Sequence, residues 1–132
     1  MKCTYTEFCI EQTIKALEKT EGFFTGHDLG LEVSKNISEN LELSDLALEM
    51  NLWKNEIRNY YEFAEEEFGI EHRPEEDIEG FIRESVAFSS RILFGLSDTA
   101  RSTWTQPVDS KAIVERLNGD FKKVKKIIFH EI

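Results

Sequence analysis

The sequence of 132 residues predicts an all-α protein, folded as a single domain that forms an irregular bundle of five or six helices. Three observations favour this class. Apolar residues recur three or four positions apart over most of the chain, which is the spacing of one face of a helix. Only two prolines occur, and most of the seven glycines stand where such apolar runs end. Finally, 40% of the residues are hydrophobic, which is enough for a core without disulfides or metals.

The first helix is predicted over about residues 5–20. Thr4 and Glu7 have the spacing of a capping box, in which each side chain can bond a free backbone amide of the other residue. Apolar side chains then recur on one face until Gly22 marks the end of the run. This stripe consists of Tyr5, Cys9, Ile10, Ile14 and Leu17.

A second, shorter helix is predicted over about residues 26–38. Thr25 stands in its capping position, three residues before Asp28, and apolar residues follow at intervals of four. Gly30 lies inside this run, where glycine costs about 1 kcal/mol relative to alanine. The stripe consists of Leu29, Val33 and Ile37.

The longest apolar stripe predicts one helix over residues 44–68. Ser44 and Asp45 can cap its beginning. Gly69 can take the left-handed conformation that ends many helices. The stripe extends over about six turns, with charged residues on the other faces. It consists of Leu46, Met50, Trp53, Ile57, Tyr60, Tyr61, Ala64 and Phe68.

A fourth helix is predicted to open at Pro74, because proline suits the first helical position, and to end near Gly95. Ser85 and Ser89 lie on its apolar stripe, and their small side chains would let a neighbouring helix approach closely. The other members of the stripe are Ile78, Phe81, Ile82, Phe88, Ile92 and Leu96.

The rest of the chain shows weaker patterns. We expect a helical turn between Ser97 and Pro107, and then a helix around Val114 that Asp109 or Ser110 caps. The final segment, DFKKVKKIIFHEI, is better suited to a helix, because a strand would place lysines on both of its faces. A short C-terminal strand, KIIFHEI, is the alternative.

The charge of the chain is unevenly distributed. Residues 1–100 carry 22 acidic and 9 basic side chains, whereas residues 101–132 carry 4 and 7, for a total of −10. A strongly acidic surface repels phosphates, so direct binding of DNA or RNA is not expected. The N-terminal region has no long apolar run, and the two cysteines lack the spacing of a zinc site. We therefore expect a reduced, cytoplasmic protein without a membrane span.

The sequence contains no pattern that is typical of an enzyme or a metal site. The three histidines form neither H-E-x-x-H nor E-x-x-H, and glycine-rich phosphate loops and G-x-S-x-G are absent. His27 and Asp28 fit a helix N-terminus. Cys9 lies on an apolar stripe, so we expect it in the core and not as a nucleophile. We predict no catalytic, cofactor-binding or metal-binding residue.

Residues 62–79, EFAEEEFGIEHRPEEDIE, hold nine acidic side chains and a single arginine, Arg73. Four of the acids lie near the end of a predicted helix, where the helix dipole disfavours each by roughly a few tenths of a kcal/mol. Functional surfaces often break local rules in this way. We predict that this acidic cluster contacts a basic partner; a solvated acidic face is the alternative. The cluster consists of Glu62, Glu65, Glu66, Glu67, Glu71, Glu75, Glu76, Asp77 and Glu79.

An acidic helical protein with such a cluster is best suited to be a stoichiometric inhibitor of a basic protein, like the bacterial immunity proteins and antitoxins that neutralise nuclease toxins. Its carboxylates would occupy the partner's nucleic-acid-binding site, and complementary charge would speed the encounter. Trp53, Tyr60 and Tyr61 are candidate anchors unless they pack in the core. One alternative is a phage-type nucleic-acid mimic that blocks a restriction or CRISPR enzyme. Another is a helical regulatory or oligomerisation subunit, including a homodimer. The lysines within Lys122–Lys126 are a further candidate contact surface.

Overall fold

The computed structural model describes residues 3–19, 22–69, 77–96, 108–109, 111 and 114–115. In this part of the chain the predicted all-α bundle is confirmed. Its five helices are α1 (Tyr5–Glu18), α2 (Gly26–Asn40), α3 (Leu43–Leu52), α4 (Lys54–Phe68) and α5 (Ile78–Leu96). A minimal antiparallel pair joins β1 (Phe23–Phe24) to β2 (Val108–Asp109).

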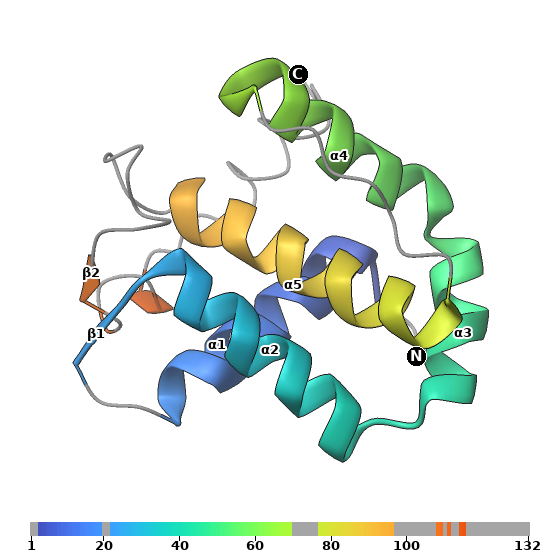
Figure 1. Cartoon of the computed structure of the whole chain (residues 1–132), viewed down its shortest axis with the longest axis horizontal. Helices are drawn as coiled ribbons and strands as arrows, with labels where there is room; N and C mark the ends of the chain where they lie inside the picture. Colours follow the sequence, from blue (N-terminus) through green and yellow to red (C-terminus); the bar gives the residue numbers. More distant parts are fainter. Residues whose placement is uncertain are drawn as a thin grey trace.

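Helix α5 is the central element of the bundle (Figure 1). It packs most extensively against α2 and also contacts α1, α3 and α4. Because neighbours surround it, α5 has buried side chains on most of its circumference, as expected for a helix in the interior. Its buried residues are Ile82, Ser85, Val86, Ala87, Phe88, Ser89, Ser90, Ile92 and Leu93.

Tyr5 is fully buried and fixes α1 against α5. Its hydroxyl donates to the carbonyl oxygen of Ser85 at 3.0 Å and lies 2.8 Å from the Oγ of Ser89. Its ring packs against Trp53 and meets Tyr60 edge to face, with ring centres 5.6 and 5.5 Å away. The two small serines therefore make room for a tyrosine that crosses from the neighbouring helix.

The prediction of one helix over residues 44–68 is wrong, because α3 and α4 meet at a bend centred on Trp53. The backbone there has φ −93° and ψ 10°, which is outside the helical region. Hydrogen bonds from Trp53 to Glu49 and from Ile57 to Trp53 still bridge the bend, at 2.9 and 3.0 Å. The indole enters the core, where it donates to the carbonyl of Cys3 at 3.2 Å and packs on Phe8. The bend thus allows α3 and α4 to contact different parts of α5.

Two of the predicted helix starts and one predicted helix end are confirmed. The hydroxyl of Thr4 accepts the backbone N–H of Glu7 at 3.1 Å, and Thr25 accepts that of Asp28 at the same distance. Gly69 ends α4 in the left-handed conformation, with φ 65°. These local hydrogen bonds explain why the sequence located these helix boundaries well.

The starts of α3 and α5 differ from the prediction. Glu42 precedes α3 without a side-chain cap, whereas Ser44 and Asp45 lie inside the first turn. At the beginning of α5, the carboxylate of Asp77 accepts the backbone N–H three residues later, at 3.1 Å. Pro74, the predicted opening residue, lies outside the described residues.

The glycine inside α2 makes room for a long side chain from α5. A methyl group at Gly30 would overlap the guanidinium of Arg91. Burial lowers the pKa of Arg91, and the neighbouring carboxylate of Glu84 opposes this effect. The poor helix propensity of Gly30 is therefore tied to close packing of α2 on α5.

Little of the chain after α5 is described. Asp109 pairs with Phe23 in the strand pair, and Ser110, the other candidate cap, lies outside the described residues. Val114 is helical, as predicted, and packs against the core. The predicted turn over residues 97–107 and the ambiguous final segment, residues 120–132, lie outside the described residues.

Replacing Tyr5 with phenylalanine should lower the free energy of unfolding by about 1–2 kcal/mol, because a buried hydrogen bond is lost and the ring is kept. Urea denaturation measures this change. Tyr61→Phe is the matched control. Its hydroxyl lies 2.6 Å from the Oγ of Ser85 but is only partly buried, so water can replace it and the loss should be smaller. Equal losses would contradict the special role of the Tyr5 hydroxyl.

Stability should fall at alkaline pH. Burial raises the pKa of Cys9, Tyr5 and Tyr60 above their ordinary values of 9.0 and 10.0, so folding favours the neutral forms. The unfolded chain loses these protons first, so their contribution is complete below about pH 9 and is lost as the pH rises further. Urea denaturation between pH 8 and 11 should show this decline, with a shallower slope in Cys9→Ala. A stability that stays constant over this range would contradict the prediction.

Candidate functional site

The described residues of the predicted acidic cluster lie at two places in the structure. On the C-terminal half of α4, Glu62, Glu65 and Glu66 are exposed. At the beginning of α5, Asp77 and Glu79 are exposed, although the hydrogen bond of Asp77 to the α5 backbone gives it a structural role. The other predicted members lie outside the description: the side chain of Glu67 and the whole of Glu71, Glu75 and Glu76.

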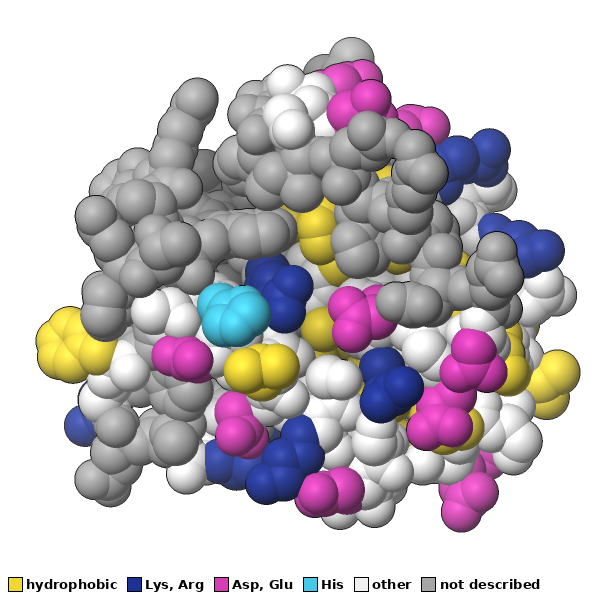
Figure 2. Space-filling model, in the orientation of Figure 1, with side chains coloured by type: hydrophobic (Ala, Val, Ile, Leu, Met, Phe, Trp, Pro, Cys, Tyr) yellow, Lys and Arg dark blue, Asp and Glu magenta, His cyan; other side chains and the backbone are white. Residues whose placement is uncertain are grey.

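Three carboxylates in the C-terminal half of α4 have no ion pair among the described residues. Arg58 precedes Glu62 by four residues, a spacing that permits an ion pair, yet its guanidinium donates to the side chain of Asn55 instead. Within the described ranges, Glu62, Glu65 and Glu66 form no ion pair. In Figure 2 acidic side chains gather over the end of α4, and basic ones lie farther toward its beginning. The charge here is unfavourable for the helix.

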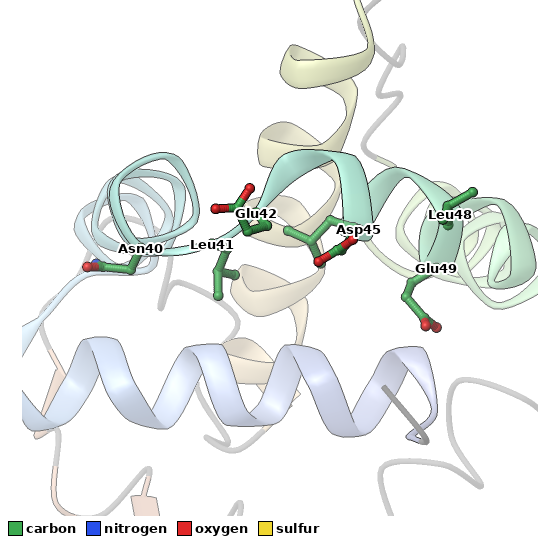
Figure 3. Close-up of a pocket in the computed structure, with 7 residues that line it drawn as sticks. Asn40, Leu41, Glu42, Asp45, Leu48 and Glu49 are labelled. Carbon is green, nitrogen blue, oxygen red and sulfur yellow. The ribbon is translucent and has the colours of Figure 1, made fainter.

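A second group of carboxylates, which the sequence analysis missed, lines a pocket at the junction of α2 and α3 (Figure 3). We call it the α3 pocket. Its volume is about 430 Å³. Three acidic side chains follow one another along its wall, and leucines provide its apolar surface. The lining residues are Asn40, Leu41, Glu42, Asp45, Leu46, Leu48 and Glu49.

Two large apolar side chains of α3 are exposed to solvent. Leu48 is 71% exposed and Leu52 is 77% exposed. The core side of this helix carries Leu46 and Met50, which are buried. Leu48 and Leu52 lie two positions after these residues, about 200° around the helix. Helix α3 is therefore apolar on two opposite sides, and only one of them packs against the rest of the described chain.

Acidic side chains from α1 and α3 act together on Cys3. Burial raises the pKa of this thiol, and the negative charges of Glu7, Glu11 and Glu49 raise it further. Glu11 is paired with Lys15 on its own helix, at 2.9 Å. The carboxylates of Glu7 and Glu11 on α1 thus add negative charge near the α3 pocket. This charge disfavours the binding of an anionic ligand there.

The sequence could have revealed this second surface only in part. The acids involved are spread over α1 and α3, so no single stretch is conspicuous as residues 62–79 are. The spacing of Leu48 and Leu52, four residues apart and out of phase with Leu46 and Met50, was the available signal. Because only one apolar stripe was assigned to this helix, its second apolar side was not recognised.

The residues considered for chemistry have structural positions. Cys9 is fully buried in the core as expected, and burial raises its pKa, which disfavours the reactive thiolate. His27 is exposed at the beginning of α2, where Thr25 provides the cap. Among the described residues, no group of three or more His, Cys, Asp or Glu side chains could hold a metal ion.

In the part of the chain that the structure covers, none of the helices combines the length and the apolar character needed to cross a membrane. No protein-family model matches this chain, and searches of curated proteins and of solved structures find no match.

Replacing Glu49 with glutamine should speed alkylation of Cys3 by iodoacetamide at pH 8, roughly twofold, because removal of a nearby negative charge favours the reactive thiolate. Mass spectrometry measures the rate, with the buried Cys9 as the unreactive reference. Glu62→Gln removes the same charge on α4 and should leave the rate unchanged. If Glu49→Gln also leaves the rate unchanged, the proximity of Glu49 to Cys3 is contradicted.

Proposed function

We propose that the protein is a stoichiometric inhibitor that binds a basic protein partner, in the manner of a bacterial immunity protein or antitoxin that neutralises a nuclease toxin. The observation that carries this proposal is the group of exposed carboxylates in the last turns of α4: Glu62, Glu65 and Glu66, which have no ion pair among the described residues.

These three charges are placed unfavourably for the helix that carries them. Carboxylates near the end of a helix repel its dipole and one another, so folding alone gives no reason to gather them there. A nuclease holds phosphates with lysine and arginine side chains, and these would supply the missing positive charge. Complementary charge also speeds the encounter and selects the partner. The carboxylates would then occupy the positions that the phosphates of a nucleic acid take.

The aromatic anchors considered from the sequence are not available to a partner. Trp53 and Tyr60 are buried in the core. Tyr61 is partly buried, and its hydroxyl bonds with Ser85 inside the bundle. The side chains that α4 offers to a partner are therefore mainly charged, and we expect raised salt to weaken binding there strongly.

Reversal of charge on α4 tests the proposal. The full chain is immobilised, exposed to a lysate of its native host, and washed first at low and then at raised salt. We expect one basic protein to be retained at low salt and released by raised salt. The triple variant Glu62→Lys, Glu65→Lys, Glu66→Lys should lose at least 90% of this capture and keep its helical circular dichroism spectrum.

The matched control reverses the same number of charges on α1 and α2, with Glu18→Lys, Glu32→Lys and Glu39→Lys. This variant has the same net charge as the α4 variant and should retain the partner. Equal loss in both variants would reduce the effect to net charge and contradict the proposal. Equal capture by the parent and the α4 variant would also contradict it.

A further inference from the structure

The outer side of α3 has the composition of a binding surface. Leu48 and Leu52 expose most of their side chains, four residues apart on one face of the helix. Burial of apolar surface is favourable, so two exposed leucines on one face leave apolar area that a partner can cover. The α3 pocket adjoins them, since Leu48 is one of its lining residues. An apolar side chain of a partner can therefore enter the pocket as well as pack on the exposed leucines.

The charged residues that line the α3 pocket are all acidic. Glu42, Asp45 and Glu49 line the pocket, and the sequence of α3 contains no basic residue. On α1, Glu7 and Glu11 lie close enough to Cys3 to raise its pKa together with Glu49. Of these two, Glu11 is compensated by Lys15. An apolar surface rimmed by carboxylates favours an apolar ligand that carries positive charge.

We propose that the α3 pocket and the exposed leucines beside it form a docking site for a basic amphipathic helix of a partner protein. Apolar side chains of that helix, three or four residues apart, would pack on Leu48 and Leu52 and enter the pocket. Lysine or arginine side chains on its flanks would pair with Glu42 and Asp45. This site lies on α3, apart from the carboxylates of α4, and does not depend on the inhibitor function.

Charge excludes the other obvious occupants. A second copy of this chain, bound through the same face, would bring Glu42 and Asp45 close to the carboxylates of the same pocket in the other copy. Nucleic acid and anionic lipid surfaces are repelled for the same reason. Among these occupants, a basic amphipathic helix alone matches both the leucines and the carboxylates.

The test uses the full chain and a fluorescent 14-residue peptide. Its leucines lie three or four positions apart, and lysines occupy positions between them. Binding is followed by fluorescence anisotropy. The variant Glu42→Gln with Asp45→Asn should weaken binding at least fivefold. The control Glu18→Gln with Glu32→Gln removes the same number of charges on α1 and α2 and should weaken binding less than twofold. Glu42 makes no capping bond, so its replacement leaves the start of α3 intact.

The apolar part of the site is tested separately. Leu48→Ala with Leu52→Ala should weaken binding at least fivefold. The control is Leu31→Ala with Ile78→Ala, which removes two other exposed apolar side chains, each 57% exposed, and should have little effect. Because all four side chains are exposed, circular dichroism should show an unchanged fold in both variants.

Three results would overturn this inference. The first is that the peptide does not bind. The second is that both charge variants weaken its binding equally, which would indicate attraction to net charge alone. The third is that analytical ultracentrifugation shows that the protein self-associates and that Leu48→Ala with Leu52→Ala abolishes this, which would make a second copy the occupant. Each result is independent of the capture experiment on α4, so the two proposals can fail separately.

Discussion

The hydroxyl of Tyr5, enclosed between α1 and α5, is the contact on which the rest of the bundle depends. A buried hydroxyl must keep its hydrogen bonds, and here the Ser85 carbonyl and the Ser89 hydroxyl are its partners inside α5. Few relative positions of the two helices satisfy this requirement. The ring of Tyr5 at the same time contacts Trp53 and Tyr60, so one residue fixes α1, α5 and the α3–α4 segment together.

The two proposed binding surfaces follow from this arrangement. Because Trp53 enters the core, the chain bends there, and α3 and α4 run in different directions (Figure 1). Helix α4 exposes carboxylates with no described counter-charge, whereas α3 exposes leucines beside a carboxylate-lined pocket. The first surface suits a ligand recognised by charge, and the second suits one recognised by apolar contact and charge together. A partner that uses both would gain affinity from two linked contacts.

The sequence predicted those features that local interactions determine. The capping threonines Thr4 and Thr25 located two helix starts, because each bonds an amide only three residues away. The bend at Trp53 was missed, since apolar residues continue through it three and four positions apart and no glycine or proline interrupts them. The α3 pocket was missed because its charge comes from separate elements. The reason for Gly30 was hidden too, since Arg91 lies 61 residues away in the sequence and meets it only after α2 packs on α5.

A competition experiment with nucleic acid tests most directly whether the carboxylates of α4 take the place of nucleic-acid phosphates on the partner. The captured basic partner is bound to a labelled DNA or RNA duplex, and the protein is then titrated into the complex. If the carboxylates occupy the nucleic-acid-binding site, the label is released completely at one equivalent of protein, and the variant with reversed charge on α4 does not release it. A stable ternary complex, in which the partner holds the nucleic acid and the protein together, would contradict this function.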